Sequence, residues 1–86
     1  MSKEDGHNWS QVREQFERRI GQTITVSIGG RRKVDAIRAK ATPVKAYVDY
    51  VLADVHTSKR HAFRECFLYA DFITGNQPDN GIIKPP

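Results

Sequence analysis

Apolar residues recur at helical spacing near the start of the chain. Each lies three or four positions after the last, so they share one side of a helix: Trp9, Val12, Phe16 and Ile20. We expect Asn8 or Ser10 to cap this helix and Gly21 to end it. A stripe of this kind most often covers a sheet, and that is the role predicted here.

The pattern then changes to the alternation typical of β-strands. Residues 23–28 alternate polar and apolar positions and are mostly β-branched, which predicts a half-buried strand. Gly29-Gly30 can supply the positive backbone angles of a tight hairpin. The return strand over residues 33–41 changes its apolar face midway, which indicates a bulge or a sharp bend.

Two interpretations stay open in the second half of the chain. Thr42-Pro43 is expected to interrupt the return strand, and residues 46–56 predict a third strand. Residues 61–74 fit a strand when read with period two. The helical period fits slightly better, with Gly75 as the stop and a stripe made of Ala62, Phe63, Cys66, Phe67 and Ala70.

The length of 86 residues allows one domain with a thin core. We expect a leader over residues 1–7, a single domain over 8–75 and a flexible tail rich in proline and glycine over 76–86. The predicted class is mostly β with an N-terminal α-helix. If residues 61–74 are helical, the alternative is an αβββα arrangement.

Composition narrows the partners and the location. A net charge of +4 and a pI near 9.5 are compatible with an acidic partner such as nucleic acid. The single cysteine, Cys66, excludes an internal disulfide and a cysteine-based zinc site. Without either, a thin core favours association with further copies of the chain. The polar start and the lack of a long apolar run predict a cytoplasmic protein that does not enter membranes.

The chain lacks the motifs of common enzymes. It contains no glycine-rich phosphate loop and no Gly-x-Ser-x-Gly elbow. His61 and Cys66 are five positions apart, so their side chains diverge on a strand or on a helix, and Cys66 is predicted to be a small core residue. Asp49 and Asp54 have the same spacing. We therefore expect no catalytic residues, no metal and no cofactor.

Three segments, taken in order, resemble the Sm and Sm-like family, which includes the bacterial RNA chaperone Hfq. Residues 24–31 are similar to the family's first strand and its glycine turn. Residues 49–54 are similar to its strand with a Leu-x-acidic ending, and residues 67–73 to the passage from its fourth strand to its fifth. The resemblance implies a strongly bent five-stranded antiparallel sheet or barrel of SH3 type, capped by the helix and assembled into a ring.

By this resemblance the chain would form a homo-oligomeric ring that binds single-stranded RNA. An aromatic side chain would stack on a base, worth roughly 1–3 kcal/mol, a lysine would attract phosphate, and three further residues would line the pore. In that order, the residues are Tyr47 for stacking, Lys45 for phosphate, and Arg60, His61 and Tyr69 for the pore, with Asp49 at the family's signature asparagine position.

Two departures from the family pattern favour a second hypothesis. Asp49 replaces the asparagine, and Tyr69-Ala70 replaces an Arg-Gly pair that grips nucleotide. An acidic group repels phosphate, and the missing arginine removes a cation. The alternative is an accessory protein-interaction module, for example one derived from a phage or mobile element, with an Sm-like or αβββα fold and no RNA binding.

Overall fold

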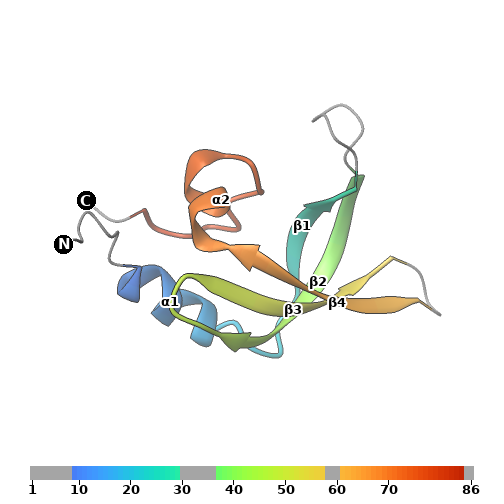
Figure 1. Cartoon of the computed structure of the whole chain (residues 1–86), viewed down its shortest axis with the longest axis horizontal. Helices are drawn as coiled ribbons and strands as arrows, with labels where there is room; N and C mark the ends of the chain where they lie inside the picture. The colour runs from blue at the N-terminus through green and yellow to red at the C-terminus, as the bar shows by residue number, and fades with distance from the viewer. Residues whose placement is uncertain (1–8, 30–36, 58–60, 85–86) are drawn as a thin grey trace.

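The computed structural model describes residues 9–29, 37–57 and 61–84. The described chain forms one antiparallel sheet in the order β1-β2-β3-β4. The two helices lie to one side of this twisted sheet (Figure 1). In chain order the elements are α1 (Ser10–Glu17), β1 (Ile24–Ile28), β2 (Ile37–Ala46), β3 (Tyr50–His56), β4 (Ala62–Leu68) and α2 (Tyr69–Thr74).

The mostly β class with an N-terminal helix is confirmed, but the five-stranded barrel is wrong. The described sheet has four strands and is open. Where a fifth strand was expected, the chain coils into α2, because Tyr69 and Phe72 lie at helical spacing and are both buried. Gly75, with φ of 92°, ends this helix as predicted. The αβββα alternative is closer, although the described residues form one strand more.

The core lies between α1, α2 and one face of the sheet. Val12 and Phe16 of α1 are fully buried, as the helical stripe predicted, whereas Ile20 is 45% exposed. The Phe16 ring lies 5.4 Å from the Tyr69 ring and 4.8 Å from the Phe72 ring, between centroids. Trp9, rather than Asn8 or Ser10, occupies the N-cap position.

The ambiguous segment 61–74 is a strand followed by a helix, which explains why both periods fitted it. In β4, Phe63 and Phe67 lie opposite Val55 and Val51 on the inner face of the sheet. Cys66 lies between them in sequence and therefore on the other face, where it is exposed. The prediction of a buried cysteine is wrong for this reason.

The second strand differs from the predicted one in its boundaries. Thr42-Pro43 does not end it; the register with β3 instead shifts between Pro43 and Lys45, as in a β-bulge. Residues 47–49 form the turn, so β3 begins later than predicted. Gly29 has φ of 70°, and the rest of the predicted hairpin, residues 30–36, lies outside the described residues, as does the 1–7 leader.

The C-terminal segment, residues 76–84, was expected to be a flexible tail but packs along β1. The Gln77 side chain accepts from Ser27 N at 2.7 Å and donates to Ser27 O at 2.9 Å. The Asn80 side chain accepts from Thr25 N and donates to Thr25 O, both at 2.8 Å. Two amide side chains thus make the bonds that a neighbouring strand would make, and the β1 edge is closed.

Candidate nucleic-acid interface

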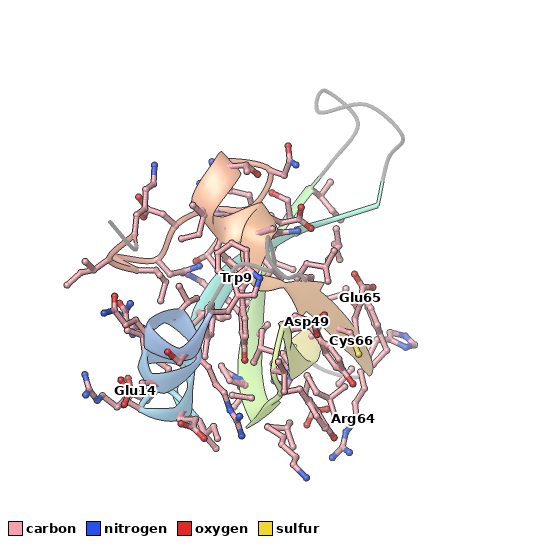
Figure 2. The ribbon with its side chains drawn as sticks, turned by 60° about the vertical axis from the view of Figure 1, so that its left-hand side comes forward. Trp9, Glu14, Asp49, Arg64, Glu65 and Cys66 are labelled. Atoms are coloured by element: carbon pink, nitrogen blue, oxygen red, sulfur yellow. The ribbon has the colours of Figure 1, made fainter. Side chains whose placement is uncertain are left out.

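The sheet face turned away from the core, here called the outer face, is free of helices in the described chain. Side chains alternate along a strand, so its members follow from the buried residues and the register. Figure 2 shows Arg64 and Cys66 of this face on the far side of the molecule from Glu14 of α1. Its charged and apolar members are Arg38, Lys40 and Lys45 of β2, Tyr50, Leu52 and Asp54 of β3, and Arg64, Cys66 and Leu68 of β4.

The outer face has an excess of positive charge. Asp54 is the acidic side chain among these members, and Arg64 Nε contacts its Oδ1 at 2.9 Å. On β2, Asp54 lies opposite Thr42, so Arg38 and Lys40 lie to one side of the ion pair and Lys45 to the other. Arg38 and Lys40 line an open groove of about 320 Å³ together with Thr25 and Ala39. Such a basic strand can attract a polyanion.

Two tyrosines and a lysine form a compact group at the β2–β3 end of the outer face. The rings of Tyr47 and Tyr50 are stacked, with centroids 4.7 Å apart and planes inclined by 18°. Lys45 Nζ lies 5.1 Å from the centroid of the Tyr47 ring, within the range of a cation–π contact. We call Lys45, Tyr47 and Tyr50 the tyrosine platform. The turn is closed by Tyr47 N, which donates to Tyr50 O at 2.8 Å and holds the two tyrosines side by side.

Tyr69 supports this turn from the inside of the molecule. Its hydroxyl donates to Tyr47 O at 2.6 Å, and its backbone N donates to Asp49 O at 3.1 Å. Burial raises the pKa of the Tyr69 hydroxyl, so the group stays protonated as a donor. The predicted pore-lining role of Tyr69 is wrong because the side chain is fully buried.

The structure brings together four of the six residues proposed from the resemblance. Lys45, Tyr47, Asp49 and Tyr69 meet at the β2–β3 turn. His61 is exposed at the opposite end of β3 and β4, where its carbonyl accepts from Thr57 N at 3.2 Å. Arg60 lies outside the described residues.

The sequence interpretation missed the part that Tyr50 plays. Tyr50 follows Tyr47 by three positions. That spacing points two strand residues to opposite faces, but a turn between them brings the side chains together. A predicted turn at residues 47–49 would therefore have placed Tyr47 and Tyr50 together.

Two searches of the described residues bear on other kinds of site. Residues 9–29, 37–57 and 61–84 contain no group of three or more His, Cys, Asp or Glu side chains that could hold a metal ion. Within the same ranges, no helix has the length and apolar character needed to cross a membrane. Searches against protein-family models and against curated proteins find no match for this chain.

Proposed function

We propose that this chain is a non-enzymatic module that binds single-stranded RNA on the outer face of its sheet. The observation that carries the proposal is the tyrosine platform, an aromatic pair with a cation beside it on an open sheet face. Unpaired bases of any sequence stack on such rings, and a cation beside the ring can bind the adjoining phosphate. The positive excess of the outer face supports the same conclusion.

The basic residues of β2 define a path for the bound RNA across the outer face. Lys40 and Lys45 lie opposite His56 and Leu52, four positions apart on β3, which corresponds to about 13 Å along the strand. A base stacked on Tyr47 would therefore leave its chain free to run along β2, past Lys45 toward Lys40 and Arg38. Asp49 lies at the turn, and its charge favours a path that leads away from the turn.

The first experiment is a titration of fluorescein-labelled oligo-U and oligo-A, followed by anisotropy over a range of salt concentrations. Affinity should fall as salt rises, because phosphate contacts release counterions. Tyr47→Ala should weaken binding about 5- to 150-fold, the equivalent of one lost stacking contact. Val48→Ala is the matched control, since Val48 is 72% exposed on the same turn. Equal affinities of Tyr47→Ala and the parent chain would rule out the platform.

The contribution of charge to RNA binding is tested separately with two substitutions, each of which removes one positive charge. Lys45→Gln should reduce the slope of log affinity against log salt by about 0.7, the value for one phosphate contact on a single strand. Arg18→Gln removes the same charge at an exposed position just after α1, away from the outer face, and should leave the slope nearly unchanged. Equal slopes for the two variants would contradict a local role for Lys45.

A protein-interaction module remains the second candidate, and exposed apolar side chains favour it. Val48 and Leu68 are 72% and 51% exposed near the platform. This candidate predicts no RNA binding at any salt concentration. The resemblance to the Sm-like family predicts a ring, and the composition predicts a cytoplasmic location. The mass of the particle in solution distinguishes a ring from a single chain or a pair of chains.

A further inference from the structure

We propose that the chain forms a two-fold dimer in which β4 pairs, antiparallel, with β4 of a second copy. This proposal does not depend on RNA binding. It starts from the two edges of the sheet, β1 and β4. An unpaired strand edge is a template for another strand, and proteins normally protect it or use it.

The backbone groups that β4 offers follow from its hairpin with β3. Thr57 N donates to His61 O, and Tyr69 N donates to Asp49 O, at the two ends of this ladder. Odd-numbered residues therefore point their N–H and C=O groups at β3, and even-numbered residues point theirs outward. The outward groups belong to Ala62, Arg64, Cys66 and Leu68.

The closed β1 edge identifies the occupant as a copy of β4. Head-to-tail assembly needs two different open edges on each copy, one to give and one to receive. Gln77 and Asn80 already bond the outward groups of Ser27 and Thr25, so β1 cannot receive a strand. An antiparallel strand can still pair with its own copy about a two-fold axis, and this association stops at two chains.

Charge selects one register among those that keep most of β4 paired. Centring the two-fold axis on Arg64 or on Glu65 places like charges directly opposite each other, which destabilises a strand pair. Centring it on Cys66 avoids both. Cys66 then lies opposite its own copy, Leu68 opposite Arg64 of the second copy, and Glu65 opposite Phe67. The exposed Leu68 is thereby covered by the aliphatic part of an arginine.

This arrangement keeps the outer faces of both copies on one side. The axis runs through the sheet, so two four-stranded sheets become one continuous sheet with both tyrosine platforms on the same face. Arg64 and Cys66 are exposed and project from β4 on the side away from α1 (Figure 2).

The test is the mass of the chain in solution without RNA, by light scattering and sedimentation under reducing conditions. The expected mass is that of two chains. Leu68→Lys should raise the dimer Kd about 2- to 30-fold, because it opposes Arg64 of the second copy twice, whereas Leu68→Glu should lower the Kd. Leu68 is half exposed, so both variants should fold, and circular dichroism checks this. Equal effects of the two charges would overturn the register.

A second measurement uses Cys66 as a reporter, since it is the chain's one cysteine. Opposed Cα atoms in a bonded antiparallel pair lie about 5.5 Å apart, so a short bismaleimide should join two chains at Cys66. Cys66→Ser must give no product.

Cys66→Pro removes an outward N–H and should yield a folded monomer, whereas Cys66→Ser should dimerise like the parent chain. A parent chain that stays monomeric at about 100 µM, or a larger closed ring, would overturn the dimer while leaving RNA binding untouched.

Discussion

At the β1 edge, the outward backbone groups of Thr25 and Ser27 are bonded by amide side chains of the C-terminal segment. At the β4 edge, the outward groups of Arg64 and Cys66 face no strand of the described chain. The same sheet therefore has one closed edge and one open edge. The difference shows that a strand is not needed to close an edge, because a side-chain amide has the same donor and acceptor pair as a peptide.

Removal of both amides should produce the largest effect. Gln77→Ala with Asn80→Ala breaks four hydrogen bonds to β1, and we expect the free energy of unfolding to fall by about 2–4 kcal/mol. The opened β1 edge should also accept β4 of another copy, which gives particles larger than a dimer. Urea denaturation measures the first effect and light scattering the second.

Asn76→Ala is the control for this variant. Its amide belongs to the same segment but bonds Asp71 at 3.4 Å rather than β1. The single change Asn80→Asp keeps the acceptor for Thr25 N and loses only the donor, so its loss should be intermediate. If the double variant loses no more stability than Asn76→Ala, the amides do not close the edge.

The sequence predicted α1 and β1 well, but it did not predict that the C-terminal segment closes the β1 edge. The helical stripe of α1 and the alternation of β1 are local patterns. The stripe predicted that Val12 and Phe16 are buried, and the alternation predicted that Val26 is buried. Gln77 and Asn80 carry no such signal, since their partners lie 50 and 55 residues away. A segment rich in proline and glycine therefore suggested a flexible tail.

The open half was harder to predict because β4 runs directly into α2. Phe63 and Phe67 satisfy both periods, so the change at Leu68 could not be located from spacing alone. The candidate site was partly predicted. Lys45 and Tyr47, two of the residues proposed from the resemblance, lie together, whereas His61 lies at the other end of the sheet, a placement that only the pairing of β3 with β4 fixes.

The second largest effect concerns the end of the open strand. Tyr69→Phe removes the hydroxyl that bonds Tyr47 O but keeps the ring packed on Phe16. We expect a loss of about 1–2 kcal/mol, because a carbonyl in a part-buried site loses its partner. RNA affinity should also fall, since the turn carries the tyrosine platform. Tyr50→Phe changes a partly exposed hydroxyl and should cost less; an equal loss would contradict the supporting role of Tyr69.

A smaller effect should appear only at alkaline pH. Burial raises the pKa of Tyr69 above its ordinary value of 10.0, so the folded chain holds a proton that the unfolded chain gives up. Its stabilising contribution is complete below pH 10 and declines as the pH rises toward the folded-state pKa. At pH 10.5 the decline should be under about 1 kcal/mol. Tyr69→Phe lacks it, so the stability difference between the two chains should narrow between pH 9 and pH 10.5; a constant difference would contradict the assignment.

The smallest effect concerns the ion pair across β3 and β4. Arg64 and Asp54 are partly exposed, so their contact should contribute only about 0.2–0.5 kcal/mol in a double-mutant cycle with alanine at each position. The Arg13–Glu17 pair, at 3.7 Å on α1, gives a matched exposed comparison. A coupling well above 1 kcal/mol would mean that charge, rather than the backbone ladder with β3, holds β4 in place. A small coupling means that the Arg64 guanidinium can turn away from Asp54 at little cost in stability. Arg64 can then pack against Leu68 of the second copy in the proposed dimer.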